Sequence, residues 1–215
     1  KHLYFSSFKS FKKDEFKYAY EVSKKLKLNL KRINHNKEFF DKNLNKTIYH
    51  LDEPLNHPHS ISIFQISEIA KRNVSVILTG EGADELFFGY ERYTDVLKKN
   101  IKEIDLLKNG AFLRTRRDIE LYNKFKTDKY GDPHSNRFKL LNKINVENKL
   151  KKFQVFETQT HLQSLLLRSD KMMMAISIEA RVPFLDKDIY DYSLNLSDKI
   201  KKNQNQKLIL KRILL

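Results

Sequence analysis

The chain has 215 residues, 40% of them hydrophobic, so it is long and apolar enough to bury a full core and is not a disordered protein. Its formal net charge of +15 is typical of nucleic-acid binders, but the lysines are spread along the whole chain and no zinc-finger or RNA-binding motif accompanies them. The lack of cysteine excludes disulfides, thiolate metal sites and a cysteine nucleophile within these residues.

The chain also lacks the sequence features of a membrane or secreted protein. No apolar run approaches the roughly 20 residues of a membrane span. The chain opens at Lys1 without an initiator methionine or an apolar leader. Basic tracts such as residues 148–153 and 198–207 are typical of solvated helix faces or loops. We therefore expect a soluble, cytoplasmic protein without nucleic-acid or membrane partners.

The first 90 residues alternate between strand and helix patterns. Strands are expected at residues 3–8, 28–33 and 74–78, and helices at 16–26 (capped by Asp14), 37–50 and 59–72. Two prolines in the segment 51–58 separate the last two helices. The run at 74–78 is almost wholly apolar, as in a strand covered on both faces. This alternation predicts an α/β fold with a parallel sheet and flanking helices.

After Tyr90 the pattern predicts helices only, as the second part of the same domain. The expected features are a basic helix at 91–117, a turn at 131–133, a helix at 153–168, a second helix capped by Ser169 or Asp170, and two amphipathic helices near the C-terminus. The segment 181–186 is expected to be extended, because the residue before Pro183 avoids the α region. The predicted division is therefore residues 1–90, α/β, and residues 91–215, helical.

The stretch "SVILTGEGADELFFGY" (75–90) reads as a strand, a glycine turn and the first turn of a helix, a geometry that exposes backbone N–H groups to an anion. It lacks the lysine of a P-loop and carries Glu81, Asp84 and Glu85 instead. Each carboxylate would repel a phosphate charge by roughly 4 kcal/mol at 4 Å unless a divalent cation lay between them. This favours a Mg²⁺ site. An acidic helix cap after a buried strand is the alternative.

Three blocks of the sequence resemble the synthetase domain of glutamine-hydrolysing asparagine synthetase, in the same order. They are "LDEP" (51–54), "LTGEGADELFFGY" (78–90) and "LLLRSDKMMMAISIEARVPFLD" (165–186). The resemblance implies an adenine-nucleotide α-hydrolase or PP-loop ATPase-like fold that is incomplete at both ends. The family's first strand and its Ser-Gly-Gly-x-Asp-Ser loop should precede Leu3, and the N-terminal glutaminase domain is missing.

The same resemblance implies a two-step ligation with ATP and Mg²⁺. Aspartate and ATP would form an acyl-adenylate, which ammonia from a glutaminase domain outside this chain would convert to asparagine; the full-length enzyme is a possible homodimer. Asp84 matches the metal ligand, and Lys171 the lysine that contacts phosphate or the oxyanion. Glu81 matches the residue that orients the acceptor or takes the amine's proton. The remaining nucleotide-binding positions are Thr79, Gly80 and Gly82.

Other positions in these blocks have structural interpretations. Lys171 is taken to begin a helix, where a cation opposes the dipole, and this favours a functional role. Residues 172–174, all methionine, are expected to fill the core. Glu179 and Arg181 are expected to form a partly buried pair. Phe88 stands where the family commonly has glycine. Asp52 is expected to cap a helix more readily than to act in catalysis.

Three other functions stay open on the sequence. One is a related adenylating ligase or amidotransferase of secondary-metabolite, peptide or surface-saccharide biosynthesis, since β-lactam synthetases and lasso-peptide cyclases share these blocks. Another is a catalytically incomplete fragment that neither hydrolyses glutamine nor turns over ATP efficiently. The last is a basic binding module without enzymatic activity, whose affinity for nucleic acid would fall steeply with salt.

Overall fold

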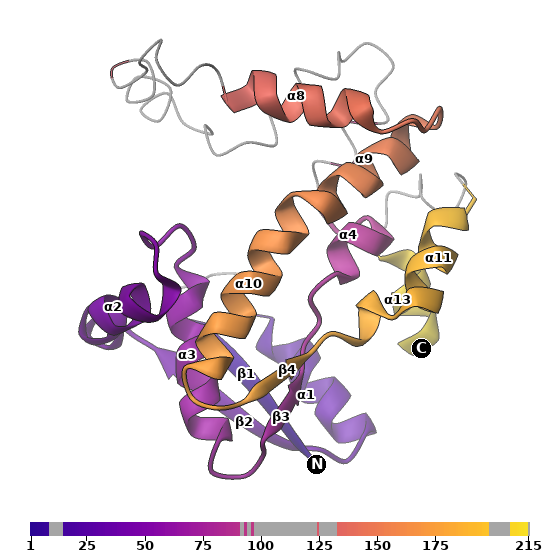
Figure 1. Cartoon of the computed structure of the whole chain (residues 1–215). Helices are drawn as coiled ribbons and strands as arrows, with labels where there is room; N and C mark the ends of the chain where they lie inside the picture. The colour runs from indigo at the N-terminus through magenta and orange to yellow at the C-terminus, as the bar shows by residue number, and fades with distance from the viewer. Residues whose placement is uncertain are drawn as a thin grey trace. The chain divides into compact units, whose positions relative to one another are not determined.

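The structure is a computed structural model, and it describes residues 1–8, 15–90, 93, 96, 124, 133–197 and 207–214. The chain forms two compact units (Figure 1). Unit 1 consists of residues 1–79 and 164–181, and unit 2 consists of residues 80–163 and 182–215. The predicted division at residue 90 concerns the organisation of the domain and stays a prediction.

Unit 1 combines parallel strands with helices, which confirms the predicted α/β class. Its elements are β1 (His2–Phe8), α1 (Phe16–Lys25), β2 (Asn29–His35), α2 (Lys37–Leu51), α3 (His59–Ala70), β3 (Val76–Leu78) and β4 (Glu179–Arg181). β1 pairs with β2 in parallel, with His2 opposite Asn29, and β3 pairs with β4 in parallel, with Val76 opposite Glu179. The described strands of this unit therefore form two separate two-stranded sheets.

Local sequence explains where the helices of unit 1 begin and end. α2 starts after Asn36, whose side chain accepts a hydrogen bond from Phe39 N at 2.8 Å, and it ends at Asp52, which has a φ of 58°. α3 starts directly after Pro58, as the proline pattern predicted. Asp14, the predicted cap of α1, lies outside the described residues.

The core of unit 1 is built by helices α2 and α3 and by the segment 164–181. Leu51, Phe64 and Met172 form one fully buried cluster. Met173 packs in a second cluster with Ala70 and Ile178. The predicted core role of the methionines is confirmed for these two, whereas Met174 is exposed.

Unit 2 is helical in its described part. Its elements are α4 (Ala83–Phe87), α8 (Pro133–Lys143), α9 (Lys149–Gln159), the short 3₁₀ helix η2 (Pro183–Leu185), α11 (Lys187–Asn195) and α13 (Leu208–Leu214). Gln154 on α9 is fully buried and its Nε2 donates to Leu86 O at 3.0 Å and to Ser193 Oγ at 3.1 Å. This one side chain therefore links α4 and α11 to α9.

Helix α10 (His161–Met174) corrects the predicted helix boundaries. The break falls at Thr160, whose Oγ1 donates to Phe156 O at 2.7 Å, and not at residues 169–170. Ser169 lies inside α10 and is buried, so it does not cap a new helix. Lys171 consequently lies in the last turn of a helix, where a cation is favourable to the dipole, and the prediction that it begins one is wrong.

Strand β4 contradicts the prediction of helices only after Tyr90. Its three residues have no strand pattern of their own, and they are extended because they pair with β3. Glu179 N donates to Ser75 O at 2.9 Å, which extends the ladder at one end. Of the predicted basic helix at 91–117, only Tyr93 and Val96 are described, and both are helical; the rest lies outside the described residues, as does most of the turn at 131–133.

The exposure of β3 differs from the prediction that both of its faces are covered. Val76 is 37% exposed and Leu78 is 68% exposed. Among the described strands, β3 pairs only with β4, and no second described strand covers its other edge. The apolar run is therefore correctly predicted as a strand and wrongly predicted as a buried one.

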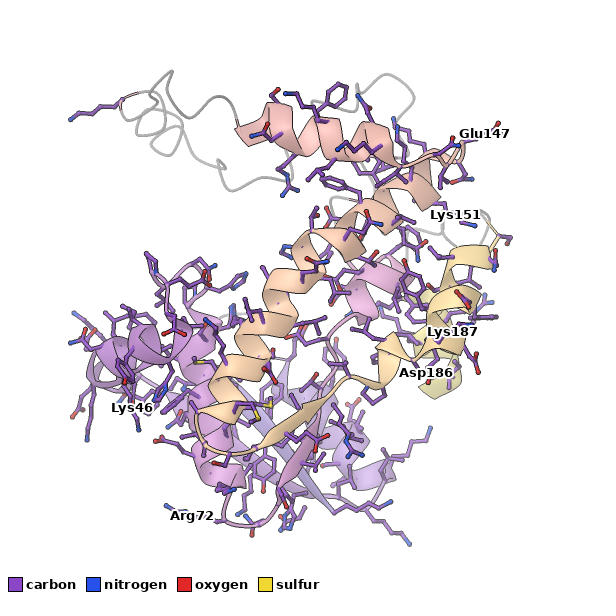
Figure 2. The ribbon with its side chains drawn as sticks, viewed as in Figure 1. Lys46, Arg72, Glu147, Lys151, Asp186 and Lys187 are labelled. Carbon is purple, nitrogen blue, oxygen red and sulfur yellow. The ribbon has the colours of Figure 1, made fainter. Side chains whose placement is uncertain are left out.

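The basic side chains lie on many different elements. Figure 2 labels Lys46 on α2, Arg72 after α3, Lys151 on α9 and Lys187 on α11. The positive charge is thus distributed over both units, as the even spacing of lysine in the sequence predicted. Across the described ranges, none of the helices combines the length and the apolar character that a membrane span requires.

Phe88, which follows α4, generates a prediction about stability. It has a φ of 57°, a left-handed conformation that costs a non-glycine residue about 1–2 kcal/mol. Its ring is buried and packs edge-on against Tyr93, with centroids 5.1 Å apart. Because loss of a buried phenylalanine costs about 3–5 kcal/mol, we expect Phe88→Gly to lower the free energy of unfolding by about 2 kcal/mol.

Urea unfolding followed by circular dichroism measures this difference. Phe88→Ala is the matched control, because it removes the ring and keeps the backbone penalty. It should be less stable than Phe88→Gly by roughly 1 kcal/mol. A Phe88→Gly protein as stable as the wild type, or more stable, would show that burial of the ring does not outweigh the backbone strain.

Candidate functional site

The turn that follows β3 begins with two glycines of different roles. Gly82 has a φ of +90° at the N-cap of α4, and a Cβ there would lie 2.5 Å from Leu185 Cδ2. The backbone conformation favours glycine at this position, and any larger residue would also displace the Leu185 side chain. At Gly80, by contrast, a Cβ would meet nothing within 4 Å. The backbone of the turn is therefore open at Gly80, where a ligand could approach it.

Thr79 fixes the start of this turn. Its backbone N donates to Arg181 O at 2.9 Å, which continues the β3–β4 ladder by one residue. Thr79 is the last residue of this segment in unit 1, and Gly80 is the first in unit 2. Four of the six predicted site residues, Gly80, Glu81, Gly82 and Asp84, lie together in unit 2 within or just after the turn.

Asp84 is a partly exposed carboxylate that holds a cation of the chain itself. Its Oδ1 lies 2.8 Å from Lys207 Nζ, and the two side chains are 31% and 34% exposed. Lys207 directly precedes α13 and belongs to the same unit. Lys207 was not predicted as a site residue, because nothing in its local pattern distinguishes it from the many other lysines.

Glu85 differs from the other two acidic residues of the turn because it is buried, whereas Glu81 and Asp84 are partly exposed. Its side chain is 1% exposed, and Tyr90 Oη donates to its Oε1 at 2.8 Å. Burial raises the pKa of the Glu85 carboxyl above its ordinary value; the Tyr90 hydrogen bond opposes this shift, and the nearby charges of Asp84 and Glu81 add to it. Glu85 is thus a buried structural acid, and Asp84 is the carboxylate that meets a cation.

Lys171 lies in unit 1, together with Thr79 and apart from the acidic turn in the division of the chain. Its Nζ donates to Leu51 O and to Asp52 Oδ2, the latter at 3.2 Å. Asp52 is the C-cap of α2, so the expected capping role is found at a helix C-terminus, where the lysine also complements the dipole. An ammonium has three donors, and this arrangement leaves one for a ligand.

The remaining candidate side chains contribute less to a site. Glu179 and Arg181 form the expected ion pair at 2.8 Å, but both are more than half exposed, so the prediction of partial burial is wrong. The rings of His57 and His59 lie 5.8 Å apart. In the part of the chain that the structure describes, no cluster of three or more His, Asp or Glu side chains could hold a metal ion.

Asp84 therefore fits a particular kind of metal ion. A single accessible carboxylate cannot form a complete protein cage for a cation. It does suit Mg²⁺, a hard ion that commonly takes one or two carboxylates and completes its shell with phosphate oxygens and water. The open backbone at Gly80, four residues before Asp84, is where such a phosphate group could be accommodated.

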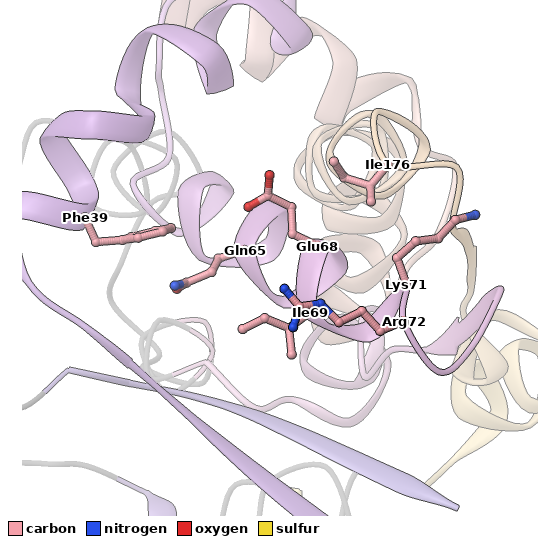
Figure 3. A pocket seen from close by; sticks show the side chains of 7 residues that line it. All are labelled: Phe39, Gln65, Glu68, Ile69, Lys71, Arg72 and Ile176. Carbon is pink, nitrogen blue, oxygen red and sulfur yellow. The ribbon is translucent and has the colours of Figure 1, made fainter.

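A pocket of about 570 Å³ lies along one side of α3 in unit 1 (Figure 3). It is lined by Phe39, Gln65, Glu68, Ile69, Lys71, Arg72 and Ile176. In Figure 3 the ammonium of Lys71 points away from the other side chains, and it donates to Ser177 O at 2.7 Å. None of the predicted site residues lines this pocket.

Comparison with known proteins identifies a family match over almost the whole chain. The family model described as asparagine synthase matches residues 2–215. The chain is 30% identical over 204 residues to asparagine synthetase [glutamine-hydrolyzing] 1 of Bacillus subtilis, which covers 79% of this chain. It is 27% identical over 187 residues to a putative asparagine synthetase [glutamine-hydrolyzing] of Mycobacterium bovis, covering 68% of this chain.

A putative asparagine synthetase [glutamine-hydrolyzing] 1 of Methanocaldococcus jannaschii is 26% identical over 190 residues, covering 87% of this chain. The chain spans 32%, 28% and 27% of the lengths of these three relatives, which is about a third or less of each.

The buried carboxyl of Glu85 generates a prediction about pH. Because its pKa is raised in the folded state, protonated Glu85 contributes stability that is fully present below the ordinary value of 4.5 and is lost as the pH rises through the raised value. Glutamine is neutral throughout and still accepts the Tyr90 hydrogen bond. We therefore expect Glu85→Gln to be more stable than the wild type at pH 8, with the difference shrinking toward pH 4.

Urea midpoints of both proteins, measured at several pH values, check this expectation. Glu147→Gln removes an exposed carboxyl of the same unit and controls for the change in net charge. A difference between Glu85→Gln and wild type that stays constant with pH, or that grows toward acid, would contradict the buried-acid interpretation.

Proposed function

Because the chain belongs to the asparagine synthase family, we propose that it forms the ATP-dependent, amide-forming part of a carbon–nitrogen ligase. In the proposed reaction the side-chain carboxylate of aspartate attacks the α-phosphate of ATP, giving β-aspartyl-AMP and pyrophosphate. Ammonia then attacks the acyl carbon and AMP leaves, which yields asparagine. The observation that carries the proposal is the acidic turn after β3, open at Gly80 and bearing an accessible Asp84.

We propose a PP-loop ATPase-like sheet in which one further parallel strand lies between β1 and β3. Two isolated two-stranded sheets are marginal on their own. Tyr4 of β1 packs in the same cluster as Ile77 of β3, and its Oη accepts a hydrogen bond from Asn73 at 3.3 Å, so the two sheets share a core. The exposed residues of β3 would be covered by such a strand, for which the relatives, being far longer than this chain, have ample sequence.

Each site residue has a distinct role in this proposal. Asp84 would hold Mg²⁺, which supplies charge neutralisation on the leaving pyrophosphate. Thr79 and Gly80 present backbone atoms to the nucleotide. Lys171 uses its remaining donor for a phosphate oxygen or the developing oxyanion. Glu81 orients ammonia and accepts the proton that the amine loses as the C–N bond forms.

The proposed partners are small molecules: ATP, aspartate, and ammonia from a glutaminase domain outside this chain. We place the reaction in the cytoplasm. A ligase with another carboxylate acceptor would share the adenylation step and the same turn. An experiment must therefore determine which carboxylate is adenylated.

Pyrophosphate release by the intact protein tests the reaction. With ATP and Mg²⁺, we expect release that depends on aspartate, and asparagine as the product when ammonia is added. Glutamate, β-alanine and a panel of peptide and sugar carboxylates serve as competitors. If pyrophosphate is released only with another carboxylate, that carboxylate is the acceptor in place of aspartate. If no carboxylate supports release, the proposal is overturned.

Single substitutions test the assigned residues in the same assay. We expect Asp84→Asn and Lys171→Met each to reduce pyrophosphate release about 10² to 10³-fold, the usual loss for one group that stabilises transition-state charge. Lys187→Met and Asp191→Asn, which break an exposed ion pair of 3.3 Å, are matched controls and should have little effect.

Lys171 also needs a control for its structural contact. Asp52→Asn weakens the same ion pair and leaves the lysine in place. If Lys171 acts only by holding the C-cap of α2, both variants should lose activity and stability together. If Lys171 contacts the reacting groups, only Lys171→Met should lose activity beyond its effect on the urea midpoint.

A further inference from the structure

The ion pair between Asp84 and Lys207 occupies the carboxylate that the proposed function assigns to a metal. The ammonium approaches Asp84 Oδ1 to 2.8 Å, a charge-assisted hydrogen bond of normal length. Both side chains are about one-third exposed, so the pair is shielded from water in part and still accessible to a solvated ion. The cation that Asp84 holds here is thus supplied by the chain.

Gly89 provides the space in which this pair forms. A Cβ at Gly89 would overlap Asp84 Oδ1 and Lys207 Cε, and it would lie 2.7 Å from Asp84 Cγ. Gly89 N also donates to Asp84 O at 2.9 Å, which closes the short helix α4. Any larger residue at Gly89 would therefore displace both side chains of the pair.

The neighbouring acid is not a substitute acceptor for Lys207. Glu85 is buried and accepts a hydrogen bond from Tyr90. α13, which begins directly after Lys207, packs against α4, so the ammonium is held close to Asp84 by the helix that follows it. A tethered cation of this kind competes with a free cation for one carboxylate at a high effective concentration.

We propose that Lys207 is an intramolecular counterion of Asp84, and that a divalent cation must displace it in order to bind. The inference rests on the proposed function in taking Asp84 as the metal ligand. It adds that the affinity of Asp84 for the bare metal is set by this competition. Removal of the ammonium leaves Asp84 uncompensated and should therefore strengthen divalent-cation binding, the opposite of what loss of a helper residue would do.

Binding of Mn²⁺ alone, counted by electron paramagnetic resonance on the intact protein without nucleotide, tests the proposal. Mn²⁺ shares the oxygen preference and octahedral geometry of Mg²⁺. We expect Lys207→Met to bind Mn²⁺ roughly tenfold more tightly than the wild type. The free energy of one hydrogen bond to a charged group corresponds to an affinity change of about this size. Lys207→Arg keeps the positive charge and should bind Mn²⁺ as weakly as the wild type.

Lys211→Met is the matched control, because it removes the same charge one turn further along α13. It should leave the Mn²⁺ affinity unchanged. Asp84→Asn combined with Lys207→Met should abolish the gain. Equal or weaker binding by Lys207→Met, tight binding that survives Asp84→Asn, or no Mn²⁺ binding by any variant would each overturn the proposal.

These outcomes are distinct from failure of the proposed function. The measurement uses neither ATP nor substrate, so a competition between Lys207 and Mn²⁺ would stand even if no carboxylate were adenylated. Conversely, pyrophosphate release could depend on a carboxylate and on Asp84 while Lys207→Met binds Mn²⁺ no more tightly than the wild type. That result would support the proposed function and contradict the counterion role of Lys207.

Discussion

Three residue pairs of a parallel ladder, between β3 and β4, determine where the acidic turn begins. Parallel strands end at the same edge of a sheet, so the segments that follow Leu78 and Arg181 leave it from neighbouring points. The bond from Thr79 N to Arg181 O extends this pairing by one residue, and Gly82 then packs directly against Leu185. Two sequence blocks that lie about 100 residues apart in the chain are thus joined at one edge of a sheet.

Helix geometry explains why the side chains of Asp84 and Glu85 have different surroundings. Consecutive residues on a helix point about 100° apart, so two adjacent carboxylates cannot face the same ligand. Asp84 faces Lys207 and solvent, whereas Glu85 faces the interior and receives the Tyr90 hydroxyl. Two adjacent acidic residues that look like a pair of ligands in the sequence are therefore one partly exposed carboxylate beside a buried acid.

The sequence predicted best those features that are determined locally. β1, β2, α2 and α3 follow from local apolar patterns, α2 begins after the capping residue Asn36 and α3 after Pro58, and the turn around Gly82 needs a glycine for its own backbone. The boundary of α10 was missed because Ser169 is a good capping residue that the fold buries inside a helix. β4 and Lys207 were missed for the same physical reason: a three-residue strand and a single lysine acquire their roles from partners that are distant in the sequence, and no local pattern records such contacts.

Two different constraints can favour glycine at the end of a helix: a left-handed backbone and a lack of space for a side chain. At the end of α4 these two constraints fall on different residues. A helix commonly ends with glycine because the left-handed conformation there is unfavourable for other residues. Here Phe88 takes that conformation, at φ 57°, and its strain is offset by the burial of its ring. Glycine stands one position later, at Gly89, where φ is not left-handed and the constraint is the volume taken by Asp84 and Lys207. Burial of the Phe88 ring thus offsets the conformational penalty at the end of α4. Glycine is needed at the next position, because a larger side chain there would overlap the Asp84–Lys207 pair. In the local sequence "ELFFGY", glycine therefore stands where the ion pair needs space, and not where the helix ends in the left-handed conformation.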